Sequence, residues 1–189
     1  MGGDETVANL KVIREDSEYK EYCENLSIDI LKIFEFSSER GMMSVVVNYN
    51  DKIIVYSKGG DKKIKNLLSP KQPFEESILD KATKLSEKGL RVLLIGMKVI
   101  DESQFNEWNY NFEEGIRDLT SEEAIHEYKS INYKMIESGL TLIGCTAVED
   151  KLQEKVPEVI KELQDGGINF WILTGDNLPT AKNIGKFLI

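Results

Sequence analysis

The sequence predicts an α+β fold, in which an antiparallel sheet with helices is followed by a partial α/β segment. Two runs rich in β-branched residues flank Asn50-Asp51, a pattern typical of a β-hairpin. After Gly139, apolar strand-like runs alternate with helical patterns, which is the order found in doubly wound parallel sheets. We therefore divide the 189 residues into a first domain at 1–138 and a partial second domain at 139–189.

The first part of the chain is expected to form one helix and three strands. The polar segment Ser17–Leu26, with scattered Tyr and Leu residues, indicates a short helix. Ile28–Phe36 alternates in polarity, which predicts a strand with a buried face. Met42–Tyr49 and Lys52–Ser57 supply the two strands of the hairpin.

Helical patterns and one more strand complete the predicted first domain. A helix is expected after Gly59-Gly60. A longer one is expected at about 75–88, where Gly89 would end it as a C-terminal cap. Arg91–Val99 is apolar and predicts a strand. The domain should end with two largely solvated helices, at 101–119 and 121–138.

The second domain is expected to follow a β-α-β-α order. The predicted elements are a strand at Leu140–Val148, a helix at Gln153–Gln164 that Gly166-Gly167 ends, a strand at Ile168–Thr174 and a helix at Leu178–Leu188. Two strands are too few for a complete α/β domain. We therefore expect the chain to end inside a second domain, or to hold half of a domain that is split in sequence.

Composition excludes several classes of function. The formal net charge of −9 argues against a nucleic-acid-binding surface, which needs a basic face. No apolar run approaches the roughly 18 residues that a membrane span needs, and no secretory leader is evident. Cys23 and Cys145 are far apart, which favours two reduced cytosolic thiols. With His126 as the single, solvated histidine, we assign no metal ligands.

Thr174, Gly175 and Asp176 follow the last predicted strand, where open α/β sheets bind their ligands. A threonine hydroxyl can donate to a phosphoryl oxygen, and glycine lets the backbone approach closely. Asp176 also precedes a predicted helix with Pro179 in its first turn, so it could simply cap that helix. The residues alone leave both interpretations open.

Three other residues have the chemistry to contact a nucleotide. Lys58 ends a strand before two glycines and could reach a phosphate, while Phe36 ends a strand and could stack on a base. Arg91 begins a strand and could clamp a phosphate. Taken alone, each is better explained structurally, as a solvated lysine, a core phenylalanine and a surface ion pair.

The order of five short motifs is more informative than any one of them. They are Phe-Ser-Ser-Glu-Arg from residue 36, Lys-Gly-Gly-Asp from 58, Gly-Leu-Arg from 89, Glu-Asp-Lys-Leu-Gln from 149 and Leu-Thr-Gly-Asp from 173. This series closely resembles the nucleotide-binding domain and following segment of P-type ATPases. Thr146–Glu158 is similar to the type IV subfamily, the phospholipid flippases, and Gly3–Leu10 loosely resembles that subfamily's Ser-Pro-Asp-Glu-Ala-Ala-Leu segment.

The resemblance implies a set of site residues. Phe36 would stack on adenine, Lys58 would line the nucleotide pocket and Arg91 would bond toward the phosphates. The nucleotide-binding set is completed by Glu5, near the adenine, and by Ser37 and Ser38. The HAD-like phosphorylation domain would contain Thr174, Gly175, Asp176 and Asp150.

The resemblance also implies what the whole protein does. ATP would phosphorylate an aspartate in Asp-Lys-Thr-Gly-Thr with the help of Mg²⁺, and this cycle would drive phospholipid transport at the cytosolic face of a membrane. The implied partners are ATP, a phospholipid bound by a membrane domain, and an accessory subunit. Neither Asp-Lys-Thr-Gly-Thr nor Gly-Asp-Gly-x-Asn-Asp occurs in this sequence, so both would lie elsewhere in a longer parent.

Departures from the family pattern leave alternatives open. Gly41 stands where the family has a lysine that helps to bind ATP, and Asn177 replaces the lysine of the Thr-Gly-Asp-Lys motif. The chain could therefore belong to an active flippase or to a degenerate regulatory module without pumping activity, such as those fused to a guanylyl cyclase in some protists. A scaffold that binds partners through its acidic face is a third reading, which the ordered motifs disfavour.

Overall fold

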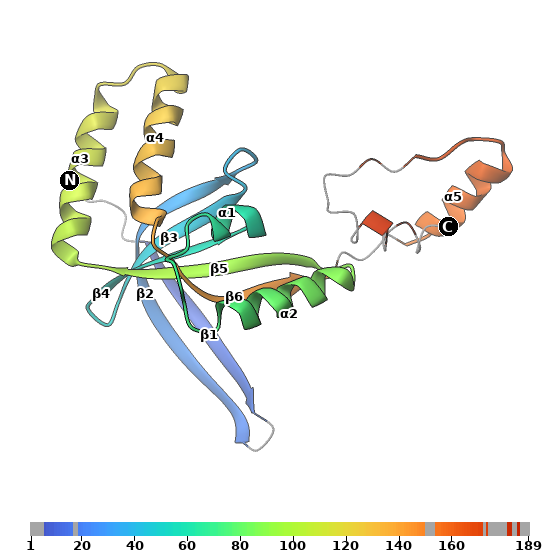
Figure 1. Ribbon diagram of the computed structural model, residues 1–189, viewed down its shortest axis with the longest axis horizontal. Coiled ribbons are helices and arrows are strands. Elements are labelled where there is room, and N and C mark those ends of the chain that lie inside the picture. Colours follow the sequence, from blue (N-terminus) through green and yellow to red (C-terminus); the bar gives the residue numbers. More distant parts are fainter. Residues whose placement is uncertain are drawn as a thin grey trace. The chain divides into compact units, whose positions relative to one another are not determined.

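The computed structural model describes residues 6–16, 19–149, 154–171, 173, 181–182 and 185 (Figure 1). The chain divides into two compact units that interleave in the sequence. The first contains Met1–Pro70 and Gly96–Thr141, and the second contains Lys71–Ile95 and Leu142–Ile189. The predicted division between residues 138 and 139 stays a prediction.

The first unit is built on consecutive antiparallel strands. These are β1 (Thr6–Asp16), β2 (Tyr19–Ser37), β3 (Met42–Tyr49) and β4 (Lys52–Gly59), each paired with the next. The sheet order is β1-β2-β3-β4-β5-β6, so the end of β5 (Arg91–Ile100) lies beside β4. This arrangement confirms the predicted antiparallel sheet with helices.

The predicted helix at Ser17–Leu26 is wrong, because Tyr19–Leu26 lies within β2. This segment pairs residue by residue with β1, as in Leu10 with Leu26 and Ile13 with Cys23. Strand preference depends strongly on the neighbouring strand, and pairing with β1 here overrides the local pattern. β1 itself was not predicted from the sequence.

The predicted hairpin at β3 and β4 is confirmed. Tyr49 pairs with Lys52, so Asn50 and Asp51 form a two-residue loop. Both have left-handed backbones, with φ of 51° and 56°, as a type I′ turn requires. Asn and Asp tolerate this conformation better than most residues, which explains why this turn could be recognised in the sequence.

Three helices complete the first unit. α1 (Asp61–Lys65) follows Gly60, as predicted. α3 (Glu102–Arg117) and α4 (Glu122–Glu137) each begin with a side-chain cap: Asp101 accepts from the Ser103 amide at 2.9 Å, and Ser121 from the Ala124 amide at 3.0 Å. Both helices were predicted, and most residues of α3 are exposed as expected, although three of its side chains enter the core.

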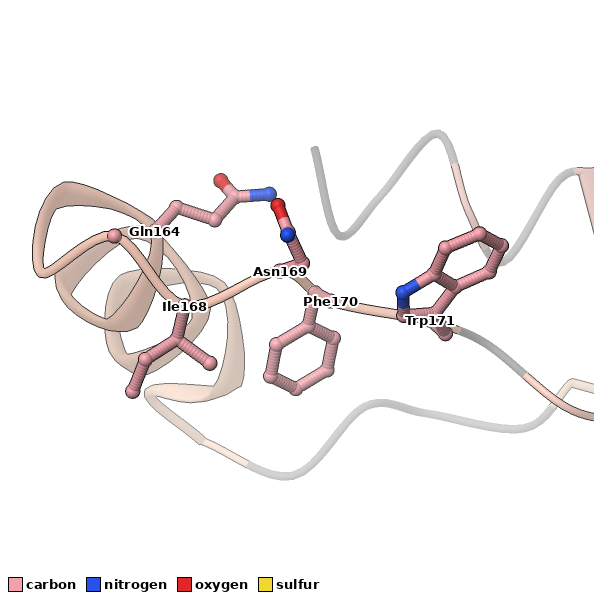
Figure 2. A pocket seen from close by; sticks show the side chains of 6 residues that line it. Gln164, Ile168, Asn169, Phe170 and Trp171 are labelled. Carbon is pink, nitrogen blue, oxygen red and sulfur yellow. The ribbon is translucent and has the colours of Figure 1, made fainter.

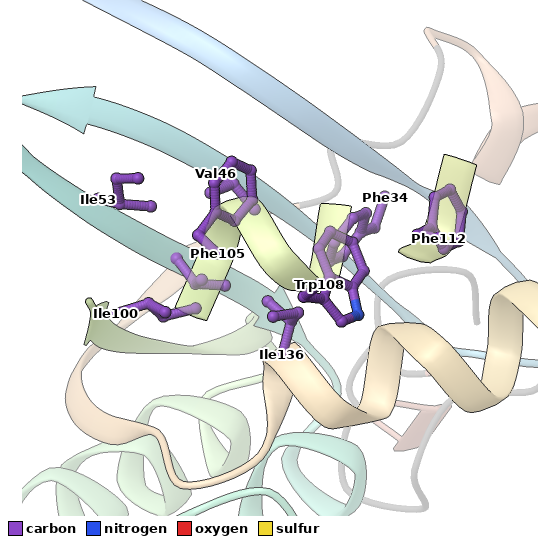
Figure 3. Packing of buried hydrophobic residues seen from close by; sticks show 9 residues of the cluster. Phe34, Val46, Ile53, Ile100, Phe105, Trp108, Phe112 and Ile136 are labelled. Carbon is purple, nitrogen blue, oxygen red and sulfur yellow. The ribbon is translucent and has the colours of Figure 1, made fainter. Parts of the chain in front are cut away.

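The core lies between α3, α4 and the sheet face against which they pack, here called the inner face (Figure 3). Phe34 is fully buried and its ring centroid lies 4.0 Å from that of Tyr133 and 5.7 Å from that of Trp108. The buried cluster comprises Phe34, Val46, Ile53, Val55, Ile100, Phe105, Trp108, Phe112 and Ile136. Phe105, Trp108 and Phe112 recur at helical spacing, which turns one stripe of α3 inward.

The second unit contains α2 (Glu75–Glu87), the start of β5, β6 (Thr141–Val148) and α5 (Val156–Asp165). Gly89 and Gly167 follow the two helices with φ of 84° and 81°, as expected for glycine caps. Residues 181, 182 and 185 are helical, and the rest of the predicted helix at Leu178–Leu188 lies outside the described residues.

The predicted strand at Ile168–Thr174 is not formed at residues 168–171 or 173. Its apolar side chains are exposed, with Trp171 at 83% and Leu173 at 94%. A strand of a parallel sheet is stable when neighbours pair with it and helices cover its faces. In the part of the chain that the structure describes, no strand pairs with this segment.

No helix among the described residues is long and apolar enough to cross a membrane.

The two tryptophans provide a matched test of the core. Trp108 is 8% exposed and donates its indole N–H to the Asn132 carbonyl at 3.2 Å, whereas Trp171 is 83% exposed. We expect Trp108→Ala to lower the free energy of unfolding by about 3–5 kcal/mol. Trp171→Ala should change it by less than about 0.5 kcal/mol. Urea denaturation followed by circular dichroism measures both, and equal effects would contradict this core.

The adjacent glycines after β4 provide a second matched pair. A Cβ added at Gly59 would lie 2.4 Å from the Met42 Cβ, whereas one at Gly60 would meet nothing nearer than 4.0 Å. Gly60 also has an ordinary φ of −60°. We expect Gly59→Ala to destabilise the protein by about 1–3 kcal/mol. Gly60→Ala should be neutral or stabilise it by up to about 1 kcal/mol, and thermal melting of the two variants would show the difference.

Candidate functional site

A β-bulge in β2 determines on which side of the sheet Phe36 lies. Phe34 pairs with Ser44 and Ser37 with Met42, so β2 has one residue more than β3 between these two pairs. Met42 and Ser44 share the inner face, and their partners therefore share it too. Phe36 adjoins Ser37 in the strand, so it lies on the opposite face, here called the outer face.

Lys58 lies on the same outer face. It pairs with Met43, while the preceding Ser57 pairs with Ser44 and is buried on the inner face. Without the extra residue in β2, Phe36 would point to the same side as Phe34, away from Lys58. The bulge therefore brings the two predicted nucleotide-binding residues to one face of the sheet.

The outer face around Phe36 is apolar and accessible. Phe36 is 63% exposed and Ile33 46% exposed, although both side chains are large and hydrophobic. The paired residues Val45 and Tyr56 continue this surface across the sheet and are half-buried. An exposed aromatic ring beside aliphatic side chains and a lysine is a suitable surface for a base attached to an anionic group.

A hollow of about 420 Å³ lies beside Phe36. It is lined by Ile33, Glu35, Phe36, Ser37, Arg40, His126, Lys129, Ser130 and Tyr133. Arg40 stands over the Tyr133 ring, with its Cζ 4.9 Å from the ring centroid. Burial raises the pKa of the Tyr133 hydroxyl, partly offset by Arg40, so the phenol stays protonated at neutral pH. The hollow thus combines aromatic rings with cationic side chains.

A buried network of polar groups connects the segments that carry Phe36 and Lys58. Glu137, 2% exposed at the end of α4, accepts at one carboxylate oxygen from Arg40 Nη2 at 2.6 Å and from Ser44 Oγ at 2.5 Å. The Ser44 and Ser57 hydroxyls lie 2.7 Å apart and are both buried. Since the Ser44 proton is directed to Glu137, the Ser57 hydroxyl donates to Ser44.

The turn that joins β2 to β3 has a tightly held backbone. The Gly41 amide donates to the Ser37 carbonyl at 2.7 Å, and the Ser37 hydroxyl accepts from the Arg40 amide at 3.1 Å. Gly41 has φ of +62° and accepts at its carbonyl from the Gly60 amide at 3.1 Å. Ser38 is exposed in this turn.

Lys63 occupies the space above Gly41. Its Nζ donates to the Glu39 carbonyl at 2.9 Å, and its Cγ lies 3.4 Å from where a Cβ of residue 41 would be. A side chain at position 41 would therefore need a strained backbone, and its Cβ would lie in van der Waals contact with Lys63. The glycine is explained by this local geometry.

Six predicted residues lie outside the first unit or outside the described residues. Arg91 is exposed at the start of β5 and belongs to the second unit. Five others lie outside the described residues: Glu5, Asp150, Thr174, Gly175 and Asp176. Their predicted roles stay predictions.

Sequence reasoning missed the groups that support the site. Arg40 was noted only as part of a motif, and Tyr133 and Glu137 were regarded as part of a solvated helix. Glu137 is separated by 97 positions from Arg40, its ion-pair partner, so no local pattern could reveal the contact. The one available signal was that Glu137 lies four residues after Tyr133, so that both share one face of α4.

The surface before Thr174 is the second place where a site was predicted. Figure 2 shows Ile168, Phe170 and Trp171 beside Gln164 and Asn169 around a hollow of about 360 Å³. None of the described residues that line this hollow is charged. Across the described residues, no group of three or more His, Cys, Asp or Glu side chains could hold a metal ion.

Comparison with known proteins gives a consistent family. Residues 3–155 match the family model "P-type ATPase, cytoplasmic domain N". Similar proteins include the phospholipid-transporting ATPase DRS2 of Saccharomyces cerevisiae, 37% identical over 92% of this chain, and the phospholipid-transporting ATPase C4F10.16c of Schizosaccharomyces pombe, 42% identical over 86%. The human phospholipid-transporting ATPase IC is 37% identical over 83%. The chain spans about 12% of the length of these relatives.

The antiparallel sheet covered by two helices agrees with the match over residues 3–155. The chain therefore belongs to the P-type ATPase family, in which it matches the cytoplasmic domain N.

Proposed function

We propose that this chain is the ATP-binding part of a phospholipid-translocating P-type ATPase. The observation that carries the proposal is the placement of exposed Phe36 and Lys58 on one face of the sheet. Relatives named as phospholipid-transporting ATPases support the lipid as the transported substrate.

Different residues of this chain would bind the adenine and the phosphates of ATP. Phe36 offers its ring to the adenine, an interaction worth about 1–3 kcal/mol per base. Lys58 is an exposed point charge on the same face and would attract the phosphates. Ser37 and Ser38 would line the turn beside the base. Glu5 near the adenine and Arg91 toward the phosphates would complete the set.

The phosphoryl transfer itself would use residues outside this chain. An aspartate in Asp-Lys-Thr-Gly-Thr would accept the phosphoryl group, with Thr174, Gly175, Asp176 and Asp150 supporting that domain. Mg²⁺ would accompany ATP in the full-length protein. The described residues present no metal cluster, so we assign the ion no ligand here. The parent would act at the cytosolic face of a membrane, with an accessory subunit as a further partner.

A degenerate regulatory module is the second candidate, and Gly41 is the observation that favours it. Gly41 stands where the family pattern has a lysine, and its φ of +62° is a backbone conformation that residues with a side chain rarely adopt. Asn177 lies outside the described residues. Weak or absent ATP binding would favour this module, whereas flanking sequence that contains Asp-Lys-Thr-Gly-Thr would favour an active pump.

Calorimetric titration of the 189-residue chain with ATP tests the proposed site. We expect millimolar or tighter binding, weakened about 5- to 150-fold by Phe36→Ala through lost stacking. Lys58→Ala should weaken it by about tenfold through the lost charge.

Two matched variants control for general effects. Tyr110→Ala removes another exposed aromatic ring, 67% accessible, from α3 in the same unit as Phe36. Lys52→Ala removes an exposed lysine on the same strand and face as Lys58, about 20 Å away. Both should bind like the unmodified chain. Equal losses for Lys52→Ala and Lys58→Ala would count against a defined phosphate-binding role for Lys58.

A further inference from the structure

We propose that Glu137 is a positioning residue that sets the geometry of the nucleotide surface from the opposite side of the sheet. The inference rests on the proposed function, because it concerns how Phe36 and Lys58 are held relative to each other. Glu137 itself contacts neither of them and would not touch the nucleotide.

One carboxylate oxygen of Glu137 is connected to both nucleotide motifs. Through Arg40, bonded at 2.6 Å, it holds the turn that follows Phe36. Through Ser44, bonded at 2.5 Å, and the Ser57 hydroxyl 2.7 Å further on, it holds the end of β4. Ser57 immediately precedes Lys58. Because neighbouring residues of a strand point to opposite faces, anchoring Ser57 inside fixes the direction of Lys58 outside.

The burial of this network argues for a role beyond stability. Glu137 is 2%, Ser44 1% and Ser57 0% exposed. Taking a carboxylate and a guanidinium out of water is costly, and well-packed apolar residues often stabilise a fold equally well. A buried ionic network does fix the orientation of the groups that it joins, because each hydrogen bond is lost when its partner moves. The network joins three segments whose relative placement the nucleotide surface depends on.

Arg40 shows the same directional constraint. Its guanidinium is held between the Glu137 carboxylate and the Tyr133 ring, and its Nε is buried without a hydrogen-bond partner. A buried donor without an acceptor is unfavourable. The arginine is therefore held in this pose by Glu137 and Tyr133, and the pose places it in the wall of the hollow beside Phe36.

Glu137→Gln tests the inference, because it keeps the shape and one acceptor oxygen but removes the charge that holds Arg40. The control is Ile136→Val, a small change in the neighbouring core residue that perturbs packing without touching the network. Each variant is titrated with ATP by calorimetry. The backbone amide shifts of residues 36 and 58 are also recorded by NMR without ATP, a readout that a general loss of stability does not move.

We expect Glu137→Gln to bind ATP at least tenfold more weakly and to shift the amides of both Phe36 and Lys58, while Ile136→Val does neither. Glu137→Gln binding within twofold of the unmodified chain, with both amides unmoved, would overturn the inference. If the unmodified chain itself binds no ATP, the proposed function fails, and the amide shifts alone then decide whether Glu137 positions the two residues.

Ser57→Ala covers the case in which Glu137→Gln does not fold. It removes only the far end of the network and leaves the Arg40–Glu137 pair intact. We expect it to weaken ATP binding several-fold and to leave the amide of Phe36 unmoved; the Lys58 amide is not used here, because any substitution at the adjacent Ser57 shifts it. A Ser57→Ala variant whose ATP affinity matches that of the unmodified chain would overturn the link between the network and β4.

Discussion

The extra residue in β2 is the constraint on which the site depends. Side chains alternate strictly along a strand, so one inserted residue moves Phe36 from the face of Phe34 to the face of Lys58. The same strand can then fill the core with one phenylalanine and expose another to a ligand. A bulge is therefore a means of giving two nearby aromatic residues different functions.

The two faces of the sheet are coupled through the residues that alternate between them. On the inner face, Glu137 bonds Arg40 and Ser44 within the cover that α3 and α4 provide. On the outer face, Phe36 and Lys58 adjoin the segments that those bonds hold. The packed inner face thus holds the exposed outer surface in place. A binding site needs such support from rigid elements to keep its geometry.

Features encoded by local signals could be predicted from the sequence. Asn50-Asp51 identified the hairpin and Gly89 the end of α2, since both conformations favour particular residue types. Features that depend on distant partners could not. Tyr19–Leu26 becomes a strand because β1 pairs with it. The bulge can be recognised only when the residues of β2 are matched to their partners in β3. Phe36 and Lys58 were found as motifs, but Glu137 has no motif, because its partners lie far away in the sequence.

The most direct test of the central claim is to add ATP to isotopically labelled chain and map the changes in amide and side-chain NMR signals. A nucleotide on the outer face should shift signals of Phe36, Met43 and Lys58, with intermolecular contacts between the adenine protons and the Phe36 ring. Shifts confined to α3 or α2, with the Phe36 ring unaffected at saturating ATP, would contradict the account.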